Sequence, residues 1–465
     1  MLTISPDDLR RHGGPVYRGL AEALAEAIDG GRLRPGDRLP PQRELAYALK
    51  VTVGTVGRAY DLLMRRGLVR GEVGRGTYVQ AGASGETPAA SLLAPPGDGT
   101  FDLSTNSPSP TAPQERLLEL TAACAADPRS LEALRYYPPV AGLPAQRAIA
   151  ASWLASLGVP AQASGTLFTG GAQGALAACL AGLARPGDVV LTEALTYGGI
   201  RSLASRLGLH AEPVAVDAEG VVPGALAQAA RHSGGRLLVL SPNIHNPTGV
   251  HMGTARREAL AEVARREGLT IVEDDVYGTL LPERPAPLAA LAPERTVYLT
   301  SASKFLAPGL RIAVAHAPPP LFDAILTAQA DLALAHSPLS AELLCRALAS
   351  GLAEKAAAAQ QAEARARQEL AGSLLDGMKL GRQPTSLHVW LEAPEPWSSA
   401  ELALALARSG VIVSPGERFQ VGRGAPPRAV RLSISAPHSR QLLALALERV
   451  AATLESGAGR RMPAI

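Results

Sequence analysis

The sequence predicts an α/β protein in two parts: a small helical unit with a β-hairpin, and a larger domain with a mainly parallel sheet and a smaller α+β lobe. Helical periodicity fills most of residues 15–66, and a stretch rich in proline, glycine and small residues follows at 81–99. Beyond it, short apolar runs alternate with helical segments, as in a parallel sheet covered by helices. A length of 465 residues agrees with about three folding units.

These patterns divide the chain into a first domain at residues 1–80, a linker at 81–98 and an α/β domain at 99–465. The α+β lobe begins at about residue 387. A long alanine-rich helix is predicted at 353–372. The predicted strands of the α/β domain lie at 166–169, 189–191, 237–240, 270–272, 297–299 and 312–315.

Composition excludes several classes of protein. A hydrophobic fraction of 47% with 19% charged residues is typical of a well-packed globular chain. Three scattered cysteines are too few for a disulfide framework or a zinc site, which indicates a reducing compartment and no metal. The first residues hold no apolar run, and the longest uncharged stretch, 148–184, is broken by proline and glycine. We therefore expect neither a signal peptide nor a membrane span, and a cytoplasmic location.

The charges are unevenly distributed. Residues 31–80 hold 10 Lys and Arg against 4 Asp and Glu, whereas the chain as a whole carries a formal charge of only +3. Such a local excess suits a polyanionic partner. Of the 45 basic residues only four are lysines, Lys50, Lys304, Lys355 and Lys379, so any reaction that needs a primary amine has few candidate sites.

The first domain has the pattern of a winged helix-turn-helix. Helices are predicted at 15–28, 41–49 and 52–66, followed by β-like runs at 68–70 and 77–79 around a glycine-rich basic turn. In this motif the second helix of the pair enters the major groove of DNA while its neighbour braces the backbone.

Five residues are the predicted DNA contacts. Arg43 begins the bracing helix, Thr52 can cap the third helix, and Thr55 and Arg58 lie on that helix away from its apolar face. Arg75 lies between two glycines at the tip of the wing and is suited to a phosphate or groove contact. The alternative for each arginine, which we consider less favoured, is an ordinary solvated surface residue.

Three stretches of this domain, LRPGDRLPPQRELA, VTVGTVGRAYDLL and GLVRGEVGRGTYV, resemble the GntR-type regulators over about residues 10–80. The resemblance implies DNA contacts at Arg43, Thr52 and Thr55. Val53 and Gly54 depart from the family, where many members have Ser-Arg or Arg-Thr, so the sequence does not predict the operator.

The stretch LTSASKFLAPGLRI, residues 299–312, provides the candidate amine. A lysine at the end of a buried strand, here Lys304, can form a Schiff base with an aldehyde cofactor. Ser301 and Ser303 can hydrogen-bond a phosphate, and Arg311 can neutralise its charge. Lys355 and Lys379 lack such a setting and are expected to be solvated.

Further candidates follow two other strands. Asp274, in VEDDVYG, can face a pyridine nitrogen and keep it protonated, and Tyr277 can hydrogen-bond a phenolic oxygen on the same ring. Asp275 is as plausible a surface acid as Asp274 when the motif is taken alone. Asn246, in SPNIHNPTG, can reach the same phenolic oxygen, although such a motif is more often an ordinary turn.

The phosphate and the ring face have candidates as well. In TGGAQGAL, residues 169–176, Ala172 and Gln173 can offer backbone N–H groups at a helix start to a phosphate. Tyr197 can stack on the cofactor ring, although an aromatic residue after a strand more often packs in the core.

In order, spacing and placement at strand ends, these motifs resemble the fold-type-I enzymes that use pyridoxal 5'-phosphate (PLP), and residues 99–465 resemble class I/II aminotransferases. The resemblance implies an aldimine between PLP and Lys304 and the cofactor-binding roles given above. It implies that Tyr137, in RYYPPVAGLP, is donated across a dimer interface. It also implies that Arg431, in VRLSIS, binds a substrate carboxylate through both ends of its guanidinium group.

The fusion of the two parts resembles the MocR family of regulators over essentially the whole chain. This implies a head-to-tail homodimer that binds double-stranded operator DNA and senses PLP, an amino compound or both through an aldimine at Lys304. One alternative is an aminotransferase acting on an amino acid, with Lys304 as its base and the winged helix secondary. Another is a repressor of cofactor synthesis for which PLP itself is the signal, which leaves Arg431 without a ligand.

Overall fold

The structure is a computed structural model, and it describes residues 16–29, 32–33, 37–65, 68–72, 76–79, 99–422 and 424–458. The chain divides into two compact units, Met1–Pro95 and Pro96–Ile465. The predicted linker at 81–98 and the predicted DNA contact Arg75 lie outside the described residues. Within the described part of the chain, no helix is long and apolar enough to cross a membrane.

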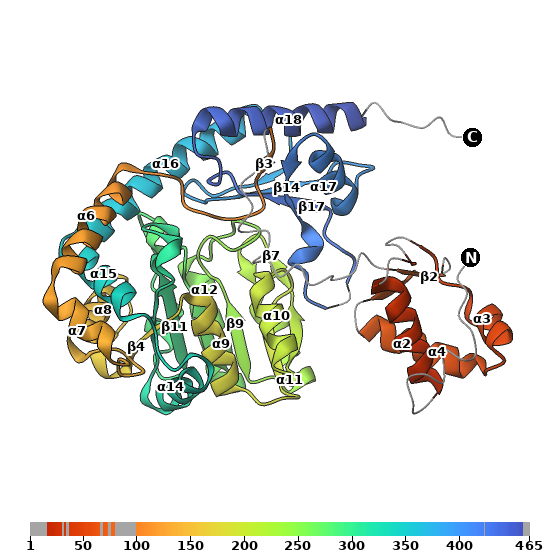
Figure 1. The fold of residues 1–465 in the computed structure, drawn as a ribbon, viewed down its shortest axis with the longest axis horizontal. Helices are drawn as coiled ribbons and strands as arrows, with labels where there is room; N and C mark the ends of the chain where they lie inside the picture. The colour runs from red at the N-terminus through yellow and green to blue at the C-terminus, as the bar shows by residue number, and fades with distance from the viewer. Residues whose placement is uncertain are drawn as a thin grey trace. The chain divides into compact units, whose positions relative to one another are not determined.

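The first unit contains the three predicted helices and the predicted hairpin (Figure 1). The hairpin strands are antiparallel, with Val69 opposite Val79. Apolar residues one helical turn apart, such as Leu20 and Leu24, are fully buried between the helices, which explains why the periodicity located them. The elements are α2 (Val16–Asp29), α3 (Gln42–Leu49), α4 (Val53–Arg65), β1 (Val69–Glu72) and β2 (Gly76–Val79).

The second unit is built on a seven-stranded sheet with the order β4-β12-β11-β10-β9-β5-β6. Only β12 runs antiparallel to its neighbours, so the prediction of a mainly parallel sheet is confirmed. The edge strand β6 was not predicted. It is only partly buried and includes His210, Glu212 and Pro213, so it does not form an apolar run. The strands are β4 (Thr166–Thr169), β5 (Val189–Glu193), β6 (His210–Val214), β9 (Leu237–Leu240), β10 (Thr270–Asp274), β11 (Thr296–Ser301) and β12 (Ala313–His316).

Helices cover both faces of this sheet. In β9, Val239 packs on one side with α9, α10 and α14, whereas Leu238 and Leu240 pack on the other side with α11 and α12. Burial on both faces explains why the strands are continuous apolar runs and not alternating ones. The helices are α9 (Ala172–Leu183), α10 (Gly198–Arg206), α11 (Pro223–Ser233), α12 (Thr254–Glu267) and α14 (Pro319–Ala333).

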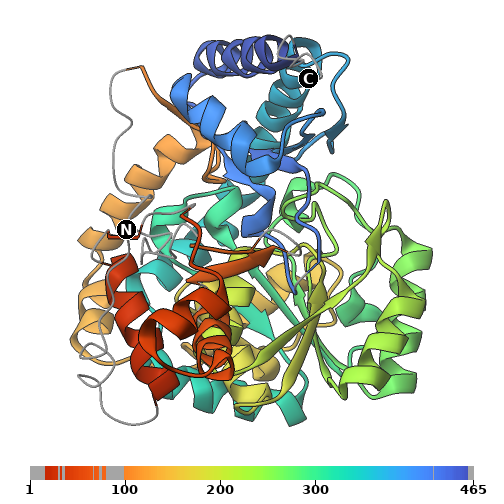
Figure 2. The same ribbon diagram turned by 90° about the vertical axis from the view of Figure 1, so that its right-hand side faces the viewer.

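A smaller lobe contains an antiparallel sheet with the order β13-β14-β17-β16. Figures 1 and 2 show this lobe, in blue, beyond one end of the seven-stranded sheet. It also includes β3 (Phe101–Asp102), which pairs with β15 (Val411–Ile412), so the lobe takes in the start of the domain as well as its end. The other elements are β13 (Leu380–Gly381), β14 (Val389–Glu392), α17 (Ser399–Arg408), β16 (Ser414–Pro415), β17 (Ala429–Leu432) and α18 (Arg440–Ala458).

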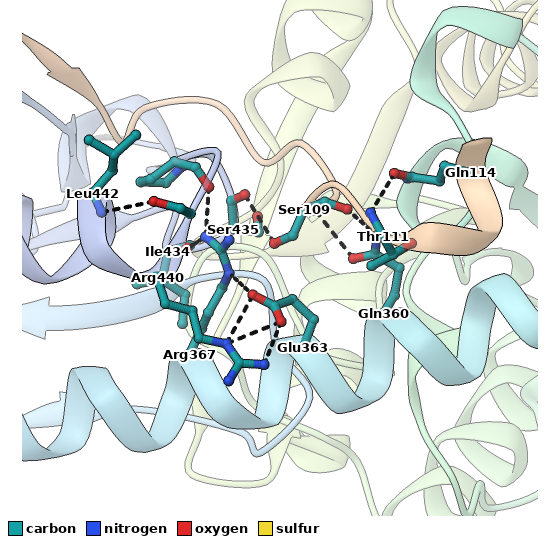
Figure 3. A network of polar contacts seen from close by, with 12 residues as sticks. Ser109, Thr111, Gln114, Gln360, Glu363, Arg367, Ile434, Ser435, Arg440 and Leu442 are labelled. Carbon is teal, nitrogen blue, oxygen red and sulfur yellow. Dashed lines mark hydrogen bonds and ion pairs between the residues drawn. The ribbon is translucent and has the colours of Figure 1, made fainter.

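Two segments connect the large and small lobes. Helix α16 (Leu352–Leu374) is the predicted alanine-rich helix; its first half packs in the large-lobe core and its second half in the small-lobe core. Residues 103–111, which we call the strap, run from β3 to α6 (Ala112–Ala126). Figure 3 shows the strap against α16, where the N–H of Ser109 donates to Oε1 of Gln360 at 3.2 Å.

The second half of α16 is attached to the small lobe by buried charge. Arg367, 1% exposed, donates to the carbonyls of Ile434 and Pro437 at 3.0 and 2.8 Å (Figure 3). Glu363 accepts from Arg367 at 2.7 Å and from Arg440, at the start of α18, at 2.6 Å. These acceptors compensate the buried charge of the guanidinium group and join this end of α16 to the small lobe.

Candidate functional site

Lys304 lies at the large-lobe end that faces the small lobe. It ends a short 3₁₀ turn, Ala302–Lys304, directly after β11. Its Nζ donates to the backbone carbonyl of Asn106 at 2.7 Å and lies 5.5 Å from the ring centroid of Tyr277. Burial is the main cause that lowers the pKa of Lys304 to about 8, with Arg431 adding to the effect and Asp274 opposing it. A partly buried amine that loses its proton at about pH 8 is suited to nucleophilic attack.

Asp274 ends the neighbouring strand β10 and is 4% exposed. Burial, followed by repulsion from Asp275, raises the pKa of Asp274 to about 7. Its Oδ1 is buried and finds no hydrogen-bond partner among the described residues. An unpartnered carboxylate oxygen in the interior is costly, so this position suits a ligand that brings its own N–H donor.

The predicted anion-binding residues come from separate elements. Gly171 precedes α9 with a positive φ of 86°, and a Cβ atom at that position would lie 2.7 Å from Nη2 of Arg311. The guanidinium group therefore lies beside the first turn of α9, where the N–H groups of Ala172 and Gln173 have no partner within the helix. Arg311 itself has a φ of 48°, an uncommon conformation for a non-glycine residue.

The serines before Lys304 are both buried, Ser301 at the end of β11 and Ser303 in the following turn. Oγ of Ser301 accepts from the N–H of Ser303 at 3.4 Å. Tyr197 precedes α10 and is 38% exposed. A Cβ atom on Gly199 would contact both the Tyr197 ring and the Gln173 side chain, so these two residues are neighbours.

Arg431 connects the two lobes at this site. It lies on β17 of the small lobe, and its Nη1 donates to Oδ1 of Asn246 in the large lobe at 2.8 Å. Its Nη2 donates to the carbonyl of Ser104 in the strap, and its Nε is buried with no partner among the described residues. Burial lowers the pKa of Arg431 to about 10. Near neutral pH the group is therefore a buried cation whose Nε–H has no acceptor among the described residues.

Tyr137 lies apart from this cluster. It follows α7 (Pro128–Arg135) and is 83% exposed, and no hydrogen bond or ring contact in the described chain joins it to the other site residues. Its role across a dimer interface stays a prediction.

Sequence reasoning missed the residues that surround Tyr277 and Lys304. The side chain of Asn106 donates to Oη of Tyr277 at 3.0 Å and to Nδ1 of His388 at 2.9 Å, and it accepts from Ser433. Asn106 stands in a short polar run after β3 with no motif around it, and its side-chain partners are 171 or more residues away. The one signal available in the sequence was the run of polar residues at 104–107. Only the structure shows that the fold buries Asn106.

In the first unit, Arg43 is exposed on the first turn of α3 and Arg58 is exposed on α4. The N–H of Thr55 donates to Oγ1 of Thr52 at 3.2 Å, so the predicted cap of this helix is confirmed. The two threonine hydroxyls lie 2.9 Å apart at the start of α4. Three of the five predicted DNA contacts thus lie on α3 and α4, and a fourth, Thr52, caps α4.

Two family models match the chain. Residues 99–450 match aminotransferase class I and II, and residues 16–79 match the bacterial regulatory proteins of the gntR family. The HTH-type transcriptional regulator YdeF of Bacillus subtilis is 32% identical over 446 residues, which covers 92% of each chain. The vitamin B6 salvage pathway transcriptional repressor PtsJ of Salmonella typhimurium is 30% identical, covering 94% of this chain and 98% of its own.

Among solved structures, an archaeal alanine:glyoxylate aminotransferase superposes with a TM-score of 0.73 at 25% identity and covers 84% of this chain and 98% of its own. The α-aminoadipate aminotransferase LysN of Thermus thermophilus, complexed with N-(5'-phosphopyridoxyl)-L-leucine, gives a TM-score of 0.70 at 26% identity, covering 80% and 97%. The predicted fold, a winged helix-turn-helix before a fold-type-I α/β domain, is confirmed.

Proposed function

Because the chain belongs to the MocR-type transcriptional regulators, in which a GntR-type domain precedes a class I and II aminotransferase domain, we propose that it senses PLP, an amino compound or both through Lys304. The observation that carries the proposal is the pair formed by Asp274 and Lys304. A buried carboxylate with an unpartnered oxygen ends β10, and a partly buried amine with a lowered pKa lies in the turn that follows the adjacent strand β11. Ionisable groups with such strongly shifted pKa values are typical of functional sites, where a ligand pairs with them.

The residues of the site fit PLP. Asp274 would hold the pyridine nitrogen, Lys304 would take the aldehyde, and Asn246 with Tyr277 would bind the phenolic oxygen, while Tyr197 would stack on the ring. The positive charge of Arg311 beside the start of α9 suits the phosphate. PLP supplies an aldehyde to which amines add and a ring that withdraws electrons. The remaining phosphate-binding residues in this proposal are Ala172, Gln173, Ser301 and Ser303.

Arg431 selects the class of amino compound. Its guanidinium group is buried, charged at neutral pH and not fully hydrogen-bonded, so a carboxylate that replaces the Ser104 carbonyl would gain a charge-assisted pair. The effector we propose is therefore an amino compound with a carboxylate, whose amine competes with Lys304 while its carboxylate binds Arg431.

The site spans two lobes, and this provides a route to regulation. Arg431 comes from the small lobe, whereas Lys304 and Asn246 come from the large lobe. A ligand that contacts both lobes binds one lobe arrangement better than others and shifts the population toward it. In the proposal, the protein is a cytoplasmic head-to-tail homodimer with Tyr137 at its interface, and this shift changes how its DNA-binding units bind operator DNA. The proposed DNA contacts are Arg43, Thr52, Thr55, Arg58 and Arg75.

Two other functions have a specific observation in their favour. The similar solved structures are aminotransferases, which favours catalysis with Lys304 as the base; steady turnover of an amino donor and a keto acid would support it. The relative PtsJ is a repressor of vitamin B6 salvage, which favours PLP itself as the signal; a change in DNA binding on adding PLP alone would support that reading.

The experiment compares Lys304→Ala with Lys355→Ala, a matched control on an exposed lysine of α16. We expect the visible absorbance of lysine-linked PLP in the wild type and in Lys355→Ala, and its loss in Lys304→Ala. Footprinting on the DNA upstream of the chain's own gene tests the regulator. Absorbance retained without Lys304 would refute the site, and the absence of any protected DNA at low salt would refute the regulator.

A further inference from the structure

The strap carries Asn106 from the small lobe to the large lobe. At its start, the N–H of Leu103 donates to the carbonyl of Ile412 in the small lobe at 2.8 Å. At its end, the N–H of Thr111 donates to Gln114 of α6 at 3.0 Å (Figure 3), and Gln114 in turn donates to the carbonyl of Leu306 at 3.0 Å. Asn106 lies between these anchors and is 8% exposed, so the fold holds it at the lobe boundary.

Every hydrogen-bonding group of the Asn106 side chain is used. Its Nδ2 has two hydrogens, and it faces Oη of Tyr277 and Nδ1 of His388. Its Oδ1 accepts from Oγ of Ser433 at 2.5 Å. Tyr277 belongs to the large lobe, whereas His388 and Ser433 adjoin small-lobe strands. The amide therefore joins the lobes directly.

His388 determines which way the amide points. Its Nε2 lies 3.2 Å from the carbonyl of His245, and since a carbonyl can only accept, Nε2 carries the hydrogen. Burial lowers the pKa of His388 well below its usual value, so the ring is neutral and Nδ1 is an acceptor. Only an N–H of Asn106 can satisfy it, and the Asn106 Oδ1 is thereby directed to Ser433.

The backbone of the same residue faces Lys304. The Asn106 carbonyl accepts from Nζ of Lys304 at 2.7 Å. Because three side-chain bonds hold the residue, this carbonyl cannot follow the lysine freely, and the lysine amine takes its position from the carbonyl. One buried residue thus contacts both Lys304 and Tyr277 and ties them to the small lobe.

We propose that Asn106 is a positioning residue, whose side chain, held by His388 and Ser433, fixes the acceptor for the Lys304 amine and a donor to the Tyr277 hydroxyl. This rests on the role proposed above for Lys304. A shift of the small lobe then moves the acceptor of the Lys304 amine, so the lobe arrangement and the state of the lysine are coupled through this residue.

The test measures the amine itself, in full-length protein freed of cofactor. Competitive labelling with acetic anhydride over a pH series, read by peptide mass spectrometry, gives the titration midpoint of each lysine. The exposed lysines Lys355 and Lys379 are references within the same sample. The charged groups that act on Lys304 are Arg431, Asp274 and Arg311, and none of these residues is substituted in the variants.

Asn106→Ala is compared with Ser109→Ala. Ser109 lies on the same strap, is buried and also donates to the small lobe, at the carbonyl of Ser435, 3.2 Å away (Figure 3), but it does not contact Lys304 or Tyr277 in the described chain. Releasing the carbonyl removes an acceptor that favours the charged amine, so the pKa of Lys304 should fall. We expect a fall of about one pH unit in Asn106→Ala and less than about a quarter of a unit in Ser109→Ala.

An unchanged midpoint in Asn106→Ala, or an equal fall in Ser109→Ala, would overturn the proposal. If Asn106→Ala does not fold by circular dichroism, Ser433→Ala replaces it, since it removes one of the three bonds that hold Asn106. A smaller fall in the same direction is then expected, again against Ser109→Ala, and no fall overturns the proposal. Because neither PLP nor DNA enters the measurement, its outcome does not depend on whether the proposed function is correct.

Discussion

Asp274→Asn should stabilise the cofactor-free protein at alkaline pH while it weakens PLP binding. Burial and Asp275 raise the pKa of Asp274 to about 7 from an ordinary value of 3.8. The folded state therefore holds this proton more tightly than the unfolded state does. The resulting stability is fully present below about pH 4 and is lost as the pH rises to about 7. Asparagine has nearly the same shape and does not titrate.

The magnitude follows from the pKa. Between pH 5 and pH 8 the contribution of Asp274 to the free energy of unfolding of the wild type falls by about 3 kcal/mol. The fall occurs over the two pH units between pH 5 and the pKa of about 7. For a folding unit of the size of Pro96–Ile465, this loss of stability corresponds to a fall in melting temperature of roughly 4 °C. Glu273, whose pKa burial also raises to about 7, adds its own loss over the same range, and that part remains in the variant. The comparison between the two proteins therefore isolates Asp274.

Tryptophan fluorescence is the suitable assay, because Trp153, Trp390 and Trp397 are the only tryptophans of the chain and all lie in the second unit. Thermal unfolding of cofactor-free wild type and Asp274→Asn is followed at pH 5 and pH 8. We expect the decline from pH 5 to pH 8 to be about 3 kcal/mol smaller in the variant. An equal decline in the two proteins would show that Asp274 is ionised in the folded state at pH 5, and would refute the reasoning.

Three further predictions concern other parts of the chain. Gly171→Ala strains a residue with a φ of 86° and displaces Arg311, so PLP affinity measured by absorbance titration should fall by about tenfold or more, with unchanged circular dichroism. Arg58→Ala should reduce the slope of log affinity for DNA against log salt by about 0.9, whereas Arg185→Ala, an exposed arginine of the second unit, should leave it unchanged. Tyr60→Phe removes the 2.7 Å bond to the Pro40 carbonyl and should cost the first unit about 1 kcal/mol, measured by hydrogen exchange of α4.

The strands of the large sheet could be predicted because helices bury both of their faces, which leaves continuous apolar runs such as Leu237–Leu240. Lys304 and Asp274 could be located for the same reason, since Asp274 ends such a strand and Lys304 follows another by three residues. Edge strand β6 breaks this rule, because it is only partly buried and includes polar residues.

The contacts of Asn106 could not be predicted in this way. Its side-chain partners Tyr277, His388 and Ser433 come from both lobes and are brought together only by the complete fold. Neither periodicity nor a local motif reports such contacts, since both depend on near neighbours in the chain. Arg431 was located through a family resemblance, while its partner Ser104 was missed because a backbone carbonyl leaves no mark in the sequence.

The most direct test of the account is whether Lys304 is needed for an amino compound to change DNA binding. Amino carboxylates are screened for a shift in the visible absorbance of the PLP-loaded protein. The active compound is then titrated into protein bound to fluorescent upstream DNA at constant salt, and anisotropy reports the affinity. We predict that the compound changes the affinity of the wild type and of Lys355→Ala but not that of Lys304→Ala, which still binds the DNA. An equal response from Lys304→Ala would contradict the account.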